Sequence, residues 1–147
     1  VPKFLQAVKL AVSKNIFTNG FMMLGFPTET KEEMELTIKT AVASDLHTAS
    51  FFTVTPFPGT ALFEYAKKNL PDRIGHIHYE DINFCLMNVN MSDVPDKTLF
   101  SCQRKATRNF FLRPRRLYRI LRDFPQPHLL PLYIPIVINR ALKGLLP

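Results

Sequence analysis

Cysteine is scarce in this chain, which has two cysteines, Cys85 and Cys102, among 147 residues. So low a number excludes a disulfide-stabilised scaffold and favours a reducing compartment. We therefore expect a cytoplasmic protein. The two cysteines lie far apart in the sequence, and we interpret both as small apolar residues, with Cys102 on the buried stripe of a helix.

Long hydrophobic runs and targeting signals are also missing. The apolar segment 129–138 is too short, and too interrupted by proline, to span a bilayer. The first residues, Val1-Pro2-Lys3, lead directly into an amphipathic helical pattern without a signal peptide. Because residue 1 is valine rather than methionine, we expect the chain to be part of a longer protein.

Acidic residues are nearly absent from the last third of the chain. Residues 1–102 contain nine Lys/Arg and eleven Asp/Glu, a net charge of −2. Residues 103–147 contain ten Lys/Arg and only Asp123, a net charge of +9. Any affinity for anionic partners therefore belongs to this basic tail.

Two strand–turn–helix patterns occupy the first half of the chain. Residues 18–24 are apolar at consecutive positions and precede the turn Gly25–Thr30, and residues 49–54 likewise precede Thr55–Thr60. Such runs are typical of strands covered on both faces, as in parallel sheets. We expect two adjacent parallel strands joined by a right-handed crossover. Functional groups in such sheets gather where strands end and helices begin.

Local signals set the expected helix boundaries in this half. Pro2 suits a first helical turn, and Asn15 suits a left-handed stop. Thr30 and Glu33 have the spacing of a capping box, and Thr60 is placed to cap the next helix. The predicted order is α-β-α-β-α. Two strands with unpaired edges cannot complete such a sheet, so neighbouring strands must come from elsewhere.

The second half is predicted to be a basic helical extension. Ser92 or Asp93 is expected to cap a helix, and the pair Arg113-Pro114 to interrupt it. In the next helix the expected apolar face is Leu117, Ile120, Leu121 and Phe124, with the arginines mostly off that face. The segment from Pro125 onward is apolar, and three prolines are expected to break it.

The first half resembles the radical S-adenosylmethionine superfamily, in particular its enzymes with an N-terminal cobalamin-binding domain. The matching stretches are Asn19–Thr30 and Phe51–Phe63, and Leu112-Arg113-Pro114 is similar to the tail of that group. The resemblance implies an α/β fold in which residues 1–72 are the C-terminal part of a partial (β/α) barrel. Residues 73–93 would then connect this part to the basic helical extension, residues 94–147.

The resemblance also implies a cofactor site. Met23 and Leu24 would flank the adenine of S-adenosylmethionine, and Gly25 would let the cofactor approach the backbone. Glu29 lies near the acidic position of the family motif, one residue out of its usual register. The cofactor-binding candidates are Met23, Leu24, Gly25, Phe26, Pro27, Glu29, Thr55 and Pro56. No catalytic residue is identified.

One departure from the superfamily is severe. Its members bind a 4Fe–4S cluster through three cysteines spaced CxxxCxxC, and this chain has only two cysteines. We expect the chain alone to be inactive and to bind neither the cluster, S-adenosylmethionine nor cobalamin stoichiometrically. The parent reaction would be reductive cleavage of S-adenosylmethionine to an adenosyl radical, with cobalamin-dependent methyl transfer as one form. The expected partners are the missing half of the barrel, a cobalamin domain, and a small-molecule or lipid-like substrate.

Several alternatives stay open at this point. The junction Gly25–Thr30 either offers unpaired backbone N–H groups to an anion or is simply a capped turn. His76 and His78, with the acidic pair Glu80-Asp81, form either a metal site or, as we favour, a solvated strand or loop.

The tail has alternatives as well. Its arginine-rich segment 104–122 could bind nucleic acid, an anionic membrane at the inner face, or the missing domains, and we favour the missing domains. For the whole chain, the alternative to an enzyme part is a non-catalytic binding or membrane-surface module.

Overall fold

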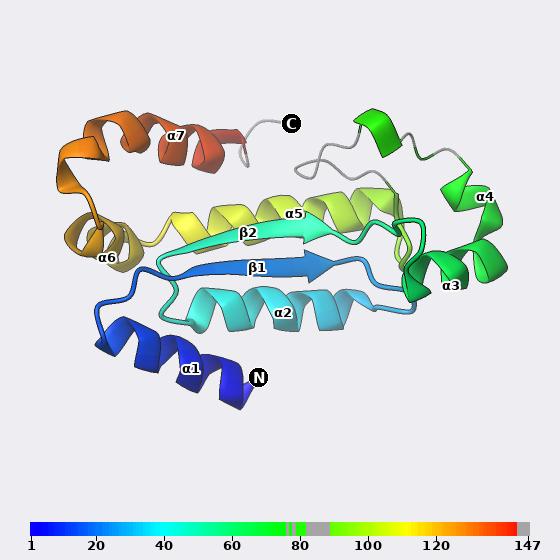
Figure 1. Cartoon of the computed structure of the whole chain (residues 1–147), viewed down its shortest axis with the longest axis horizontal. Coiled ribbons are helices and arrows are strands. Elements are labelled where there is room, and N and C mark those ends of the chain that lie inside the picture. The colour runs from blue at the N-terminus through cyan, green and yellow to red at the C-terminus, as the bar shows by residue number, and fades with distance from the viewer. Residues whose placement is uncertain (76, 78, 82–88, 144–147) are drawn as a thin grey trace.

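Two parallel strands and the helices that cover one of their faces form the centre of the protein (Figure 1). In the computed structural model, which describes residues 1–75, 77, 79–81 and 89–143, β1 (Asn19–Leu24) pairs with β2 (Thr48–Thr53). The register places Asn19 opposite Thr48 and Leu24 opposite Thr53. The predicted adjacent parallel strands are confirmed, and the mixed α/β class with them. The partial barrel stays a prediction.

Helices make up most of the remaining structure. The helix α2 (Lys31–Ala43) connects the strands, and α5 (Asp96–Phe111) packs beside it. Figure 1 places α3 and α4 beyond the carboxyl ends of the strands and α6 at the opposite end. The other elements are α1 (Pro2–Ser13), α3 (Ala61–Asn69), α4 (Pro71–Ile74), η1 (Tyr79–Asp81), α6 (Pro114–Asp123), η2 (Pro127–Leu129) and α7 (Leu130–Lys143).

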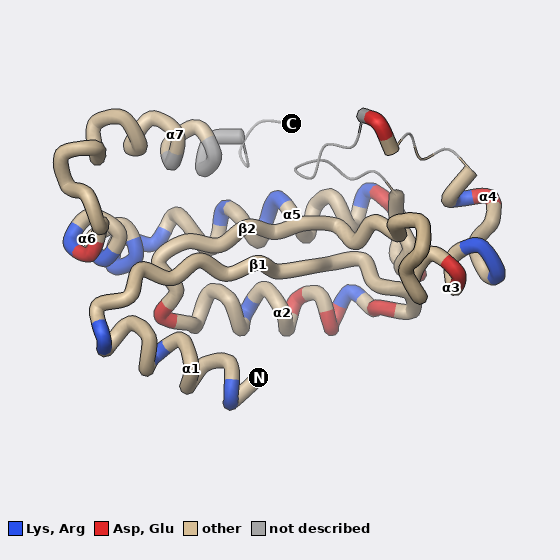
Figure 2. Tube along the Cα trace, viewed as in Figure 1, with Lys and Arg blue, Asp and Glu red and all other residues tan. Residues whose placement is uncertain are grey.

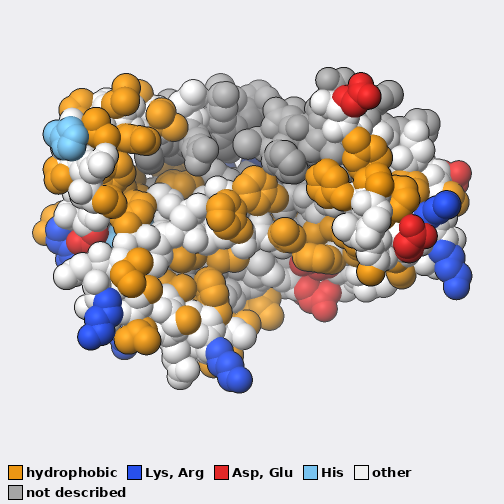
Figure 3. Space-filling view, in the orientation of Figure 1, with side chains coloured by type: hydrophobic (Ala, Val, Ile, Leu, Met, Phe, Trp, Pro, Cys, Tyr) orange, Lys and Arg blue, Asp and Glu red, His pale blue; other side chains and the backbone are white. Residues whose placement is uncertain are grey.

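The two faces of the strand pair differ in burial. Alternate residues of both strands are buried against the helices, among them Met22, Leu24 and Phe51. On the opposite face the side chains of Phe21 and Met23 are 68% and 53% exposed. Figure 3 shows hydrophobic side chains over the strands on this uncovered face. Within the part of the chain that the structure describes, helices cover one face only, and coverage of the second face by neighbouring segments stays a prediction.

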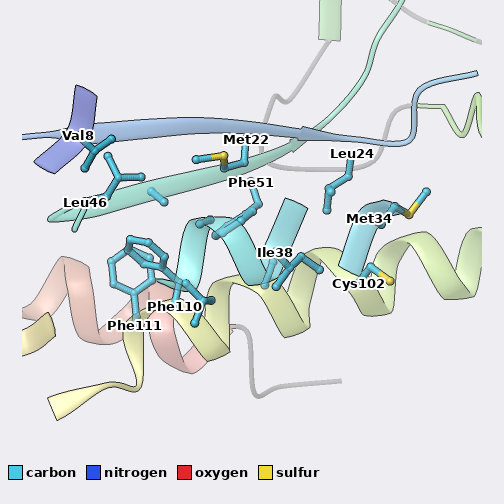
Figure 4. Close-up of a cluster of buried hydrophobic side chains, with 14 of the residues drawn as sticks. Val8, Met22, Leu24, Met34, Ile38, Leu46, Phe51, Cys102, Phe110 and Phe111 are labelled. Carbon is cyan, nitrogen blue, oxygen red and sulfur yellow. The ribbon is translucent and has the colours of Figure 1, made fainter. Parts of the chain in front are cut away.

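The main core lies between the strand pair and the helices α2 and α5 (Figure 4). Burial of apolar surface here supplies the main stabilisation, at about 25 cal/mol per Å². Cys102 is 4% exposed within this core, as its helical stripe predicted, and burial raises the pKa of its thiol. The side-chain amide of Gln103 donates to the Phe51 carbonyl over 2.9 Å and ties α5 to β2.

Most of the predicted helix ends are confirmed. Thr30 and Glu33 form the reciprocal capping box of α2, and Thr60 caps α3. Asn15, two residues beyond α1, has a φ of 58°. The predicted cap of α5 is wrong. That helix begins at Asp96 without a side-chain cap, because the Ser92 hydroxyl instead donates to the side chain of Asn90 over 2.6 Å.

The predicted break at Arg113-Pro114 is confirmed, whereas the predicted apolar face of α6 is confirmed only in part. Ile120 is buried and Phe124 is half-buried, but Leu117 and Leu121 are 39% and 47% exposed. Arg116 is buried in their place, at 5% exposure. Figure 2 shows how closely the cations gather along α5 and α6.

The guanidinium of Arg116 closes the end of α2. It donates to the carbonyls of Leu46, Val42 and Ser44, the last two over 2.8 and 3.2 Å. It also lies 3.7 Å from the ring centroid of Phe110. The last carbonyls of a helix lack partners within the helix, and an arginine fork can reach several of them. Burial, followed by the charges of Arg119 and Arg113, lowers the pKa of Arg116 to about 10.

The segment after α6 is more regular than its prolines suggested. Helix α7 runs from Leu130 to Lys143 with Pro135 inside it, and it packs near α5. Proline at this place removes one hydrogen bond but leaves the helix continuous. Among the described residues, no helix is both long enough and apolar enough to cross a membrane.

Replacing Arg116 should strongly destabilise the fold. Arg116→Met leaves three buried carbonyls without a donor, so we expect the free energy of unfolding to fall by about 3 kcal/mol. Urea denaturation measures this change. The matched control is Arg115→Met, which removes the same charge from an exposed neighbour. Equal losses in the two variants would contradict the assigned role.

A second long-range contact joins α6 to the segment before β2. The Nε2 atom of His47, a 1% exposed residue, lies 3.1 Å from Asp123 Oδ2, and its Nδ1 accepts from the Thr18 backbone N–H over 3.1 Å. Arg122 also donates twice to Asp123, over 2.6 and 2.7 Å. The bonds from Arg122, and then the bond from His47, hold the pKa of Asp123 well below its usual range, against an opposing effect of desolvation.

The lowered pKa of Asp123 predicts acid sensitivity. A carboxylate with a depressed folded-state pKa stabilises the fold above its unfolded value of about 4, and this contribution is lost as the pH falls. Asp123→Asn should therefore be less stable than wild type at pH 7, with a difference that shrinks between about pH 4 and pH 2. Urea titrations across this range, with the exposed Asp93→Asn as control, measure it. A difference independent of pH would show that charge is not involved.

Candidate functional site

The turn after β1 is held together by a glutamate. The Glu29 carboxylate accepts from the backbone N–H groups of Gly25 and Phe26, over 2.5 and 3.0 Å. Glu33 serves the capping box instead, accepting from the Thr30 backbone N–H over 2.9 Å. The capping box is therefore complete without Glu29. The alternative that these N–H groups are unpaired is wrong for Gly25 and Phe26.

The Glu29 side chain reaches back to the N–H groups of Gly25 and Phe26 because two residues of the turn have a left-handed backbone. Gly25 has a φ of +87° and Thr28 a φ of +64°, both in the left-handed region. These two reversals return the chain on itself, and the N–H of Glu29 donates to the Phe26 carbonyl over 3.0 Å. The carboxylate therefore occupies the place that the sequence offered to an anionic ligand.

The turn after β2 lies alongside the first. The N–H of Val54 donates to the Leu24 carbonyl over 2.9 Å, which extends the parallel pairing by one bond. Pro56 is fully buried, and its carbonyl accepts from the Tyr79 hydroxyl over 2.9 Å. Burial raises the pKa of this phenol. Thr55, between them, is half-buried.

The eight predicted cofactor-binding residues thus gather at the carboxyl edge of the strand pair, but their side chains point differently. Met23 lies on the uncovered face, and Phe26 is 43% exposed. Leu24 is completely buried against the helices, so only its backbone is available to a ligand on the uncovered face. Their role in cofactor binding stays a prediction.

Close packing against α5 is a further reason why residue 25 is glycine. A Cβ atom built there would lie 3.0 Å from Leu99 Cδ2 of α5, closer than ordinary van der Waals contact. The glycine therefore allows both the left-handed turn and the close approach of α5. Gly59, in the second turn, has a φ of +84° with no atom within 4 Å of its Cβ position.

A partly buried polar network beyond the strand ends was not predicted from the sequence. Arg73 Nη1 donates to the carbonyls of Asn90 and Ser92, both over 2.9 Å. The side chain of Asn90 donates to the Val94 carbonyl and to Asp96, and accepts from Ser92. The short Asn-x-Ser spacing, typical of an Asx turn, was the available signal. Because these groups satisfy one another, the network fixes residues 90–96 in place.

The residues present do not fit an iron–sulfur cluster. The whole sequence has two cysteines, fewer than the three closely spaced thiolates of the family motif, and Cys102 lies in the main core. Cys85, His76 and His78 lie outside the described residues. Within the described ranges, no three His, Cys, Asp or Glu side chains are grouped as metal ligands.

Comparison with known proteins yields one similarity. An uncharacterized methyltransferase of Pyrococcus horikoshii is 34% identical over 143 residues. The aligned part is 97% of this chain but 28% of the relative, so the chain spans little more than a quarter of that protein. No family model and no solved structure matches the chain.

The two turn glycines offer a matched pair of mutations. Gly59→Ala should cost about 1 kcal/mol, the penalty of a left-handed backbone alone. Gly25→Ala should cost about 1–3 kcal/mol more, because its new methyl group also meets Leu99. Urea denaturation of both variants measures the difference. Similar costs would mean that α5 does not limit the space at residue 25.

Proposed function

We propose that this chain is the C-terminal part of an S-adenosylmethionine-dependent methyltransferase of the radical type, and that it supplies the wall beside the adenine and the substrate. One observation carries the proposal: the carboxyl edge of a parallel strand pair, with a glycine turn and an uncovered apolar face, is available to a ligand. The methyltransferase name of the relative supports the same chemistry.

The residues of this chain have a binding and positioning role. Met23 and Phe52, at the carboxyl half of the uncovered face, offer an apolar surface on which an adenine ring can lie. Glu29 holds the turn and fixes the backbone at Gly25 and Phe26. Bound S-adenosylmethionine would supply the methyl group or, with a reduced cluster, the adenosyl radical.

The remaining parts of such an enzyme must lie outside this chain. The cluster ligands and any cobalamin domain would belong to other segments, since the cysteines needed are not here. Further strands of the barrel would cover Phe21 and Met23, which otherwise expose a continuous apolar surface. A small or lipid-like substrate would be enclosed between them.

A second candidate is a binding module without catalysis. The observation that favours it is the exposed apolar surface of the tail, where Leu132 and Tyr118 are 67% and 66% exposed and Arg122 lies 5.9 Å from the ring centroid of Tyr118. Three clustered cysteines in the coding sequence upstream of Val1 would decide for the enzyme. A native start codon at this point would decide for the module.

Cofactor binding tests the proposal in the complete protein that the gene encodes. Met23→Lys should weaken S-adenosylmethionine binding at least tenfold in calorimetry, because the lysine places a charge against an apolar ring. The fold should survive, since Met23 is exposed. Tyr118→Lys, at an exposed residue of α6, is the control and should leave affinity unchanged.

Two results would oppose the proposal. Absence of S-adenosylmethionine binding by the complete wild-type protein would remove the methyltransferase assignment. Unchanged affinity in a folded Met23→Lys variant would remove the uncovered face from the site.

A further inference from the structure

A concave surface lies between α2 and α5, away from the carboxyl edge of the strands. It is an open groove with a volume of about 370 Å³. Its walls come from exposed parts of the two helices and from the chain that leaves α5, namely Ile38, Lys39, Val42, Arg108, Asn109, Leu112 and Arg113. This volume lies within the range of small-molecule sites.

The lining of the groove is positively charged, and Lys39 is attracted to Glu35, one turn earlier on α2. Lys39, Arg108 and Arg113 line it, and no carboxylate does among the residues that the structure describes. Within the described ranges, none of the three makes an ion pair. Three cations around one hollow repel one another, and an anion placed between them would relieve that repulsion.

The nearby carboxylates are already engaged. Glu35, one turn before Lys39 on α2, pairs with Lys105 over 3.3 Å. Asp45, just beyond α2, pairs with Arg119 over 2.8 Å. Neutralising the groove from within the fold would break one of these pairs.

The floor of the groove is apolar. Ile38 and Val42 are 4% and 9% exposed, and Leu112, at the rim, is 50% exposed. Arginine side chains bind phosphate or carboxylate through two parallel hydrogen bonds, and Asn109 adds an amide donor. A ligand that matches both the cations and this floor has an anionic head and a short aliphatic part.

We propose that the groove between α2 and α5 binds an amphiphilic anion, a phosphate or carboxylate attached to a short aliphatic chain. Arg108 and Arg113 hold the head, and Lys39 completes its neutralisation. Ile38, Val42 and Leu112 contact the chain. This site is separate from the cofactor site proposed above, because its described lining residues come from α2, α5 and the chain after α5 and not from the carboxyl edge.

Calorimetry with three soluble probes tests the site in the complete protein that the gene encodes. Octyl phosphate, used below its critical micelle concentration, carries both features; inorganic phosphate carries only the charge and octyl glucoside only the alkyl chain. We expect octyl phosphate to bind at least tenfold more tightly than either of the others. Equal binding of octyl phosphate and octyl glucoside, or no binding of octyl phosphate, would overturn the proposal.

Charge-matched variants locate the binding. Arg108→Gln and Lys39→Gln should each weaken octyl phosphate binding at least fivefold, whereas Arg115→Gln, at an exposed residue of α6 outside the groove, should not. All three sites are exposed, and thermal melting verifies that the variants fold. Equal weakening in all three would show attraction by net charge alone and would overturn the groove as the site.

Experiments with lipid vesicles distinguish the two possible sources of the bound anion, a lipid headgroup and a soluble metabolite. Co-sedimentation with phosphatidate vesicles that Arg108→Gln abolishes identifies a lipid headgroup. Octyl phosphate binding without vesicle binding identifies a soluble metabolite. Either result supports the proposed groove, whereas vesicle binding unaffected by Arg108→Gln would place the lipid contact elsewhere on the tail and oppose it.

Discussion

The packing of α5 beneath the strand pair is the contact on which the rest of the structure depends. Leu99 lies against Gly25 where β1 ends, and Gln103 bonds to the Phe51 carbonyl in the middle of β2. The ring of Phe110, also from α5, meets Phe51 and supports the guanidinium of Arg116. One helix, distant in sequence, therefore sets the turn at the candidate site, the strand pairing and the attachment of α6.

What the sequence could predict was local. The capping box at Thr30, the cap at Thr60 and the stop at Asn15 depend on residues within a few positions of one another. The parallel pairing could also be predicted, because apolar runs separated by one helix have few ways to pair. The gathering of the candidate residues at one edge follows from that topology alone.

The parts that could not be predicted depend on distant partners. Arginine at position 116 is polar by type, and only the carbonyls that end α2 make a buried position favourable for it. Ser92 has the chemistry of a helix cap, but Asn90 takes its hydroxyl. Likewise, two left-handed residues return the Glu29 carboxylate to the turn, where sequence spacing suggested an unoccupied anion site.

Contacts with distant partners also change how the net positive charge of the tail, residues 103–147, is interpreted. Much of the charge from residue 103 onward is committed inside the fold: Arg116 to α2, Arg119 to Asp45, and Arg122 to Asp123. Arg104 lies over the ring of Phe100, 4.5 Å from its centroid. The tail is thus not a uniform basic surface of the kind that attracts nucleic acid through many equivalent phosphate contacts. Its cations act one by one: Arg108, Arg113 and Arg115 make no ion pair among the described residues, and the first two converge with Lys39 on the groove between α2 and α5.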